Sequence, residues 1–264
     1  MGLVELGHGD VGRIADALRR QGPLQAYALG DLDPFFLPYT RWLGWDRDGA
    51  LTQIALLYVE PDPPVLHALA VERPEELRGL LDAAGERLPD RVYAHLPLSL
   101  LEPPPAGYAF AETPTLHLKM ALEHRGEVVA NAVGTFDLLG PDDRAELDAL
   151  YAAAYPRTWF EPRMLETRRY VGRRENGRLI AVAGVHLHSA ALRVAAIGNV
   201  ATHPDHRGHG HARQLCAHLC VLLAGDGIET IALNVDVDNL AAAAVYRRLG
   251  FEEVGRFAEV TLER

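Results

Sequence analysis

A strand, a glycine-rich loop and a helix follow one another directly within residues 193–224, and this segment constrains the fold more than any other part of the chain. Residues 193–202 are apolar, and the sequence RGHGHA at 207–212 leads into a helix expected over roughly 208–224. Glycines let the main chain approach a ligand closely and turn successive N–H groups outward. The helix start adds a partial positive charge. The segment therefore predicts an anion-binding turn, suited to a pyrophosphate.

Two better-known phosphate motifs do not describe this loop. No Gly-Lys-Ser/Thr follows it, so it is not a Walker A loop. It also departs from the dinucleotide fingerprint, because Arg213 stands where that fingerprint has a third Gly or Ala. Arg207 can supply a countercharge to an anion. An ordinary glycine turn that caps a helix stays open as the alternative at this point.

A second segment, residues 239–251, strengthens the anion-site interpretation. Asn239 is a predicted N-cap, and the alanines at 241–244 keep one helix face thin enough for a ligand to lie against it. Tyr246 lies seven residues after Asn239, two helical turns further along the same face. Gly250 is the expected C-cap and Phe251 begins the last strand.

Together the two segments resemble the acetyl-CoA-binding core of the GNAT superfamily of N-acetyltransferases. Residues 207–212 match the family's Arg/Gln-x-x-Gly-x-Gly/Ala loop. The second signature is matched by Asn239, Ala242, Tyr246, Gly250 and Phe251. The resemblance covers about 190–252 and extends less fully over 127–264. The run GNVATHP at 198–204 and the long N-terminal half also resemble two-lobed members related to glycine N-acyltransferases.

The fold class expected is α/β, with a GNAT-type mixed central sheet flanked by helices in the C-terminal lobe and a smaller, diverged α/β N-terminal lobe. Residues 1–125 form the predicted N-terminal lobe, a candidate degenerate GNAT-like half, and residues 126–264 form the predicted acetyltransferase domain. Helices are expected at 10–20, 74–88, about 141–154, 208–224 and 239–248. Strands are expected at 51–59, 65–71, 91–96, 115–122, 168–175, 179–188, 193–202, 228–235 and 252–262.

The resemblance implies direct transfer from a coenzyme A thioester to an amine, without a covalent enzyme intermediate. It implies that the backbone of Val200 and Thr202 holds the pantetheine and polarises the thioester carbonyl. Amides of residues 208–213 would hold the pyrophosphate, Asn239 would bond the pantetheine arm, and Tyr246 would assist the departing thiolate. The expected site residues are Asn199, Val200, Ala201, Thr202, Arg207, Gly208, His209, Gly210, His211, Ala212, Arg213, Asn239, Ala242 and Tyr246.

The base that deprotonates the acceptor ammonium is not assigned by the sequence. Glu161, Glu166, His186 and His188 all fall before or on strands expected near the site. A chain of water molecules is an equal alternative. Each of these side chains also has a plain structural or solvated interpretation.

The composition of the chain limits the kinds of partner and the cellular compartment that we expect for it. Lys+Arg is 26 against 36 Asp+Glu, a formal charge of −10, which disfavours nucleic acid and membrane surfaces. Lys119 is the only lysine. Two cysteines rule out a disulfide scaffold, the first residues do not read as a secretory signal, and no apolar run approaches the ~20 residues of a membrane span. A cytoplasmic protein is expected.

Two other clusters have competing interpretations. Five histidines and two cysteines crowd the loop region, namely His203, His206, His209, His211, His218, Cys216 and Cys220. No zinc spacing appears and both cysteines share an apolar helix stripe, so no metal is expected. Residues 34–39, with Trp42 and Trp45, form the densest aromatic patch. We interpret this patch as part of the hydrophobic core of the N-terminal lobe. The alternative is that it forms one wall of the acceptor pocket.

The predicted function is transfer of an acetyl or short acyl group from acetyl-CoA, the acyl donor, to a small-molecule amine or amino-acid-like acceptor through a ternary complex. The alternative from another class is a non-catalytic acyl-CoA-binding sensor. Tyr246 favours the enzyme, whereas the unassigned base leaves room for the sensor. The sequence identifies neither the acceptor amine nor the oligomeric state, and a homodimer remains an alternative.

Overall fold

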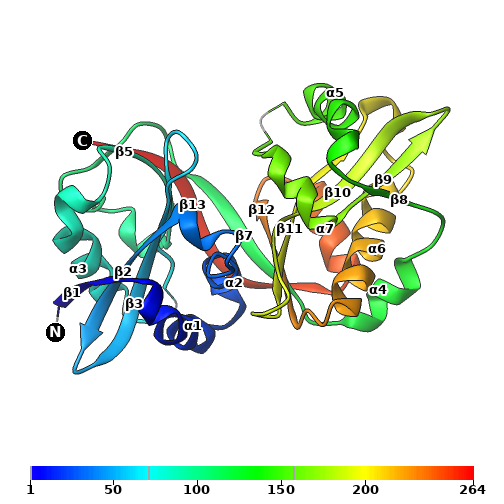
Figure 1. Ribbon diagram of the computed structural model, residues 1–264. Coiled ribbons are helices and arrows are strands. Elements are labelled where there is room, and N and C mark those ends of the chain that lie inside the picture. The colour runs from blue at the N-terminus through cyan, green and yellow to red at the C-terminus, as the bar shows by residue number, and fades with distance from the viewer. Residues whose placement is uncertain (1, 71, 157) are drawn as a thin grey trace. The chain divides into compact units, whose positions relative to one another are not determined.

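The computed structural model describes residues 2–70, 72–156 and 158–264. The chain divides into two compact units (Figure 1). Unit 1 comprises Met1–Lys119, Val235–Asp238 and Glu253–Arg264, and unit 2 comprises Met120–Asn234 and Asn239–Glu252. Both units are mixed α/β, as predicted. The predicted boundary at 125/126 was contiguous, whereas the C-terminal residues Glu253–Arg264 belong to unit 1.

Unit 1 is a mixed sheet with three helices. Its elements are β1 Gly2–Leu6, α1 Val11–Arg20, α2 Ala26–Gly30, β2 Thr40–Arg47, β3 Ala50–Tyr58, β4 Val65–His67, α3 Pro74–Ala84, β5 Arg91–Leu96, β6 Ala109–Phe110 and the start of β7 Thr115–Leu122. The strand order is β1-β2-β3-β4-β5-β13, with β6 also paired to β13. All of these pairs are antiparallel except β4 with β5, which is parallel.

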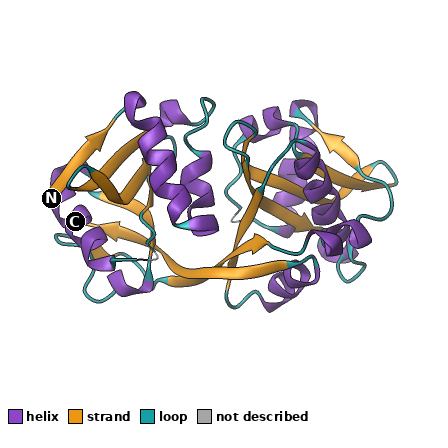
Figure 2. Ribbon diagram, turned by 90° about the horizontal axis from the view of Figure 1, so that it is seen from below, coloured by secondary structure: helices purple, strands orange, loops and turns teal. Residues whose placement is uncertain are grey.

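The two faces of the unit 1 sheet are covered by different helices (Figure 2). Leu77, Leu80 and Leu81 of α3 form one hydrophobic cluster with alternate residues of β3, including Ala55 and Leu57. Because side chains alternate along a strand, the residues between them face the other side, where α1 packs on β3. The predicted aromatic patch contributes Phe36 and Trp42 to the buried interior, as its core interpretation required.

Unit 2 contains the segment that carries the sequence motifs. Its elements are α4 Arg125–Asn131, β8 Asp137–Leu139, α5 Arg144–Ala154, β9 Tyr170–Glu175, β10 Arg178–Ser189, β11 Val194–Thr202, α6 His211–Gly225, β12 Thr230–Asp236, α7 Leu240–Arg248 and the start of β13 Phe251–Glu263. The strand order is β12-β11-β10-β9-β8. The β11–β12 pair is parallel and the others are antiparallel.

Helix α6 anchors unit 2 because one of its faces is entirely apolar. Leu215, Leu219 and Leu223 are fully buried where α6 packs on β9, β10 and β11. Cys216 and Cys220 share this interior as free thiols, and burial raises the pKa of the Cys216 thiol to about 12. They behave as small hydrophobic residues, as predicted. None of the described helices has the length and apolarity needed to cross a bilayer.

The two units share one connectivity. In each, three antiparallel connections are followed by a strand–helix–strand crossover that makes the final pair parallel. The crossover helix is α3 in unit 1 and α6 in unit 2. The loop that enters α6 therefore has a topological counterpart in the segment that enters α3.

Candidate functional site

The central strand pair of unit 2 separates part of the way along its length. β11 pairs with β12 from Val194↔Thr230 to Ile197↔Leu233, and the described pairing ends there. β11 nevertheless continues to Thr202, paired on its other edge with β10. Gly198, Val200 and Thr202 are half-exposed along this stretch. An extended ligand can add to such an unpaired edge through main-chain hydrogen bonds.

A β-bulge lies in the same stretch of β11. Gly198 pairs with Gly184 and Ala201 with Val182, so β11 carries one extra residue there. Asn199 holds the left-handed conformation that absorbs this residue, with φ of 54°. The hydroxyl of Tyr151 donates to the Asn199 carbonyl oxygen at 3.0 Å and fixes the bulge.

The side chain of Asn199 is committed to the interior of unit 2. It is 4% exposed, and its Nδ2 donates to the Tyr170 hydroxyl at 2.8 Å. Its Oδ1 accepts from the Thr158 hydroxyl at 2.9 Å and lies 3.2 Å from Nε2 of His186. The prediction placed Asn199 among the cofactor-contacting residues, whereas its side chain instead supports the strand that would do so.

The loop before α6 exposes a run of unpaired amides. Gly208 and Gly210 adopt φ of 83° and 79°, a left-handed conformation that glycine adopts without strain. Among the described residues of unit 2, the amides of residues 208–213 donate to no backbone carbonyl, and that of Gln214 is the next to do so. No residue from Gly208 to Arg213 is buried. Unpaired amides are what an anion-binding turn requires, and the anion site itself stays a prediction.

Arg207 is tied to the protein rather than to the loop amides. Its Nε donates to the Thr202 carbonyl at 3.3 Å and its NH2 donates to the Ala154 carbonyl at 3.1 Å. It thus bridges the end of α5 to the end of β11 while adding positive charge beside the loop. His211 is partly buried, and burial is the main reason that its pKa is lowered. The lowered pKa favours a neutral His211, so the positive charge beside the loop comes from arginines such as Arg207 and Arg213, whose NH2 lies 3.7 Å from the Cβ position of Gly210.

Helix α7 begins as its sequence predicted. The Oδ1 of Asn239 accepts from the Ala242 amide at 3.1 Å, which makes Asn239 the N-cap. Ala241 and Ala244 are exposed on the thin part of the helix. Tyr246 is 8% exposed, and its ring stands edge-on to Phe251 at 6.0 Å between centroids. These residues keep their predicted positions, and their roles toward a cofactor stay predictions.

The structure separates the four candidate bases. His188 lies 3.1 Å from Asp226 at the opposite end of the strand pair from the bulge. Glu161 is paired with Arg163 at 2.8 Å, and Glu166 is exposed. His186 alone of the four lies beside the bulge, through its contact with Asn199.

The histidine and cysteine cluster shows no metal-binding geometry. No group of three or more His, Cys, Asp or Glu side chains that could hold a metal is found in the part of the chain that the structure describes. His206 instead pairs with Glu175 at 3.0 Å, and His218 contacts the Val133 carbonyl at 3.1 Å.

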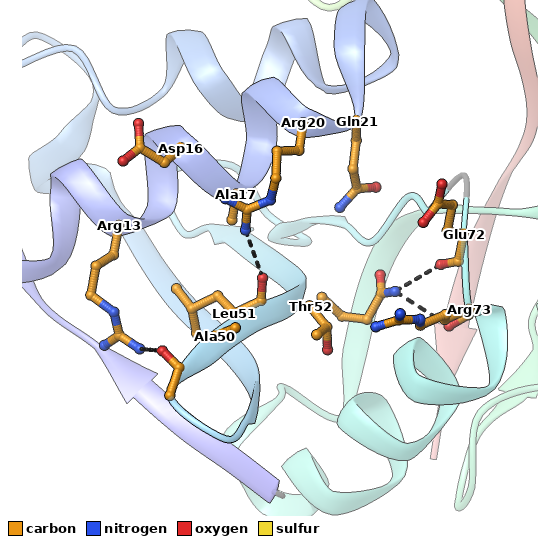
Figure 3. A pocket seen from close by; sticks show the side chains of 12 residues that line it. Arg13, Asp16, Ala17, Arg20, Gln21, Ala50, Leu51, Thr52, Glu72 and Arg73 are labelled. Atoms are coloured by element: carbon orange, nitrogen blue, oxygen red, sulfur yellow. Dashed lines mark hydrogen bonds between the residues drawn. The ribbon is translucent and has the colours of Figure 1, made fainter.

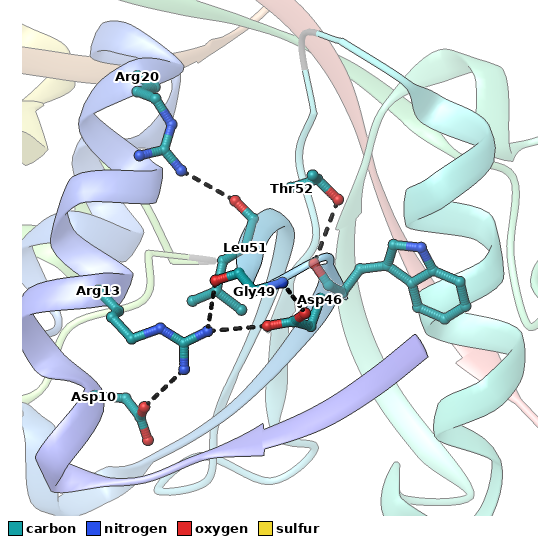
Figure 4. A network of polar contacts seen from close by, with 8 residues as sticks. Asp10, Arg13, Arg20, Asp46, Gly49, Leu51 and Thr52 are labelled. Carbon is teal, nitrogen blue, oxygen red and sulfur yellow. Dashed lines mark hydrogen bonds and ion pairs between the residues drawn. The ribbon is translucent and has the colours of Figure 1, made fainter. Parts of the chain in front are cut away.

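A hollow of about 690 Å³ lies in unit 1, away from the motifs (Figure 3). Arg13 and Arg20 line its α1 side, but both guanidinium groups are already used (Figure 4). Arg13 bonds the carboxylates of Asp10 and Asp46, and Arg20 donates to the Leu51 carbonyl at 3.0 Å. The guanidinium groups of Arg13 and Arg20 therefore already have hydrogen-bond acceptors within unit 1.

Three residues that sequence reasoning missed contribute to the site. Tyr151 and Tyr170 hold Asn199, and burial raises the pKa of both phenols, so both remain neutral donors. The Oδ1 of Asn234, next after the last paired residue of β12, is buried and has no hydrogen-bond partner among the described residues. The break between strands could have pointed to Asn234, because a polar residue there interrupts an apolar strand.

Comparison with known proteins finds similarity over part of unit 2. Residues 136–251 match the Acetyltransferase (GNAT) family. Over 79 residues the chain is 37% identical to ribosomal protein bS18-alanine N-acetyltransferase of Escherichia coli K12, covering 30% of this chain and 51% of that enzyme. Over 99 residues it is 32% identical to mycothiol acetyltransferase of Kocuria rhizophila, covering 36% of this chain and 32% of that enzyme. The chain thus spans half or less of the curated relatives it matches.

The fold of the whole chain has a counterpart among solved structures. A tandem GNAT protein from the clavulanic acid biosynthesis pathway superimposes with a TM-score of 0.60 at 17% identity, covering 98% of this chain and 97% of that one. At this identity the likeness concerns the fold alone.

Proposed function

We propose that this chain transfers an acetyl or short acyl group from acetyl-CoA directly to an amine, because residues 136–251 match the Acetyltransferase (GNAT) family. The observation that carries the proposal is the run of unpaired, solvent-facing amides from Gly208 to Arg213 at the start of α6. Such a run, backed by a helix dipole, binds a diphosphate without needing side-chain charge.

In this proposal the pantetheine lies along the free edge of β11. The main chain of Val200 and Thr202 faces it, and an amide at the bulge stabilises negative charge on the thioester oxygen. Asn239 uses its oxygen to cap α7, which leaves its NH2 group to donate to the pantetheine arm. The buried Oδ1 of Asn234 supplies an acceptor on the opposite strand. Ala201 and Ala242 provide small neighbours.

The chemistry requires one bond to form and one to break. The acceptor nitrogen attacks the acyl carbon, the carbon–sulfur bond breaks, and Tyr246 donates a hydrogen bond or a proton to the leaving sulfur. A phenol of pKa ~10 facing a thiol near ~8.5 gives up its proton at a cost of about 2 kcal/mol, so a strong hydrogen bond serves as well as full transfer.

The acceptor class is inferred from the relatives and the surface charge. The two relatives are named for an alanine of a ribosomal protein and for mycothiol. We infer a small-molecule amine or amino-acid-like acceptor, and the formal charge of −10 argues against nucleic acid or membrane partners. The run at 198–204 supports a relation to two-lobed glycine N-acyltransferases.

Replacing Gly210 by Val is expected to weaken acetyl-CoA binding by about 10-fold. The left-handed φ of 79° strains a β-branched residue by about 1–2 kcal/mol, and relieving that strain turns the loop amides away. Isothermal titration calorimetry with acetyl-CoA measures the change.

Gly227→Val is the matched control for Gly210→Val. Gly227 has the same φ of 79° in the same unit, lies after α6 rather than before it, and has open space at its Cβ position. We expect it to lower stability to a similar extent while leaving the affinity for acetyl-CoA unchanged. Equal affinity losses in both variants would refute the assignment of the loop.

Unit 1 is expected to bind no acyl-CoA, so the chain should take up one equivalent. The counterpart segment before α3 opens with Pro74, which has no N–H, and places Glu75 and Glu76 in the first turn. These carboxylates repel a diphosphate from that helix start. We propose that unit 1 is a degenerate copy of the same fold. A calorimetric stoichiometry of two would contradict this.

Thiol release measured across a panel of primary amines tests the function itself. Release of coenzyme A that depends on both the amine and Tyr246 supports the transferase. Tight acetyl-CoA binding without release for any amine would instead favour a sensor, and absence of binding would refute both.

A further inference from the structure

His186 lies where β11 leaves β12. It is on β10, one residue after Val185, which pairs with Ile197, and Ile197 is the last residue of β11 that pairs with β12. A Cβ atom on Gly198 would come within 2.2 Å of the His186 ring, so the ring packs flat against the backbone of Gly198. The imidazole is therefore fixed beside the strand edge to which the proposed function assigns the thioester.

The hydrogen-bond network around His186 determines its neutral tautomer. The Tyr170 hydroxyl donates to the Val185 carbonyl at 3.0 Å, so it accepts the bond from Asn199 Nδ2. This orients the amide and leaves Asn199 Oδ1 as an acceptor toward both the Thr158 hydroxyl and His186 Nε2. His186 must then carry its hydrogen on Nε2, and the basic lone pair of the neutral ring lies on Nδ1.

The surroundings of the ring suit a group that exchanges protons. Trp159 stands edge-on to it at 5.6 Å between centroids, and the side chain of His186 is half-buried. The carboxylate of Glu161 is held in an ion pair with Arg163. His188, two residues further along β10, is bound to Asp226, which is itself paired with Arg169.

We propose that His186 is the general base of the acyl transfer, an inference that rests on the proposed function. Nδ1 accepts a proton from the acceptor ammonium, which leaves a neutral amine whose lone pair forms the bond to the acyl carbon. The proton on Nδ1 then passes to solvent, while the leaving sulfur receives its hydrogen from the nitrogen through Tyr246. Asn199, which holds the tautomer from Nε2, is a positioning residue.

The tautomer can be tested without knowledge of the acceptor. In a long-range ¹H–¹⁵N spectrum of the full chain labelled with ¹⁵N-histidine, the signals lost in His186→Gln identify His186. We expect the neutral form to carry its hydrogen on Nε2. A neutral form protonated on Nδ1 would overturn the proposal.

The kinetic test uses the same variant with acetyl-CoA and a panel of primary amines. Gln retains an N–H donor for Asn199 but no basic nitrogen, so turnover at pH 7 should fall by about 10²-fold. It should recover as rising pH deprotonates the amine itself, and the affinity for acetyl-CoA should not change. His188→Gln is the matched control and should keep the wild-type rate and pH profile.

The outcomes distinguish this proposal from the function on which it rests. If the wild-type protein is active and His186→Gln has the same rate and pH profile, only the proposed role of His186 is refuted. Wild-type protein that binds no acetyl-CoA overturns the proposed function, whichever tautomer His186 adopts.

Discussion

Turnover of the Tyr246→Phe variant is expected to fall by about 10²- to 10⁴-fold, with little change in the affinity for acetyl-CoA. The phenyl ring keeps the edge-on contact with Phe251, and the side chain is 8% exposed, so the substitution removes the hydroxyl with little loss of packing. In the proposed mechanism, the group that disappears is the donor to the leaving sulfur, which is needed only as the carbon–sulfur bond breaks.

The rate and the affinity must be measured separately. Thiol release under saturating acetyl-CoA gives kcat, and calorimetry gives the affinity of the resting protein. Tyr108→Phe is the control: it also deletes a buried tyrosine hydroxyl, in unit 1, where that hydroxyl bonds the Pro89 carbonyl. Full turnover in Tyr246→Phe would remove Tyr246 from the mechanism, and an equal loss in both variants would indicate a general effect of lost stability.

The second prediction with a large expected effect concerns the free energy of unfolding and involves Lys119. This side chain is fully buried in unit 1 and its Nζ has no hydrogen-bond partner among the described residues. The ammonium lies 3.8 Å from the ring centre of Tyr27 and 5.3 Å from that of Phe257. Burial lowers the pKa of Lys119 to about 7, while the charge of Glu259 opposes that shift.

The sign of the pH dependence follows from this lowered pKa. Between pH 7 and 10.5 the unfolded chain keeps the proton on Lys119 and the folded chain has lost it. Because the unfolded state then binds more protons, stability rises with pH across this window. A pKa shift of this size lowers the free energy of unfolding by about 5 kcal/mol at most. This cost applies at and below neutral pH.

Lys119→Met is therefore expected to stabilise unit 1 at pH 7 by several kcal/mol and to remove this rise with pH. Methionine fills a similar volume without a buried charge. Glu259 keeps a 2.6 Å hydrogen bond from the Tyr93 hydroxyl and the nearby rings of His95 and His117, so its carboxylate is not stranded.

Urea unfolding of wild type and variant at pH 6, 7, 9 and 10 measures both effects. Trp42 and Trp45 lie in unit 1, so tryptophan fluorescence reports mainly on this unit. We expect the two free energies of unfolding to converge as pH rises. A variant that is less stable than wild type at pH 7 would show that Tyr27 and Glu259 fully offset the burial of the charge.

Much of the fold could be predicted where local pattern and turn chemistry agree. Strands 91–96 and 115–122 were predicted with the bounds that the structure has, and Gly208 and Gly210 of the predicted loop both have positive φ. The prediction missed β2, because aromatic side chains on both faces hide its alternation. It also missed α4, because residues 123–135 are polar enough to read as a connection.

Features of the candidate site could be predicted where they depend on neighbouring residues, but not where they depend on residues far along the chain. The loop amides and the Asn239 cap depend on neighbours within four residues, and both were found as expected. Asn199 was grouped with the cofactor contacts because it lies in the motif, yet its partners come from 13 to 41 residues away. The choice among four candidate bases depended on such contacts and could not be made from spacing.

The sequence by itself predicted the unpaired amides of the loop that enters α6, because glycine φ angles and unpaired first-turn amides are local properties of the chain. Only the tertiary structure decided that β11 leaves β12 after Ile197, that His186 rather than His188 lies beside that break, and that the single lysine is buried. These features depend on which strands pair and which side chains lose contact with water. Both are settled by packing between residues that the sequence keeps far apart.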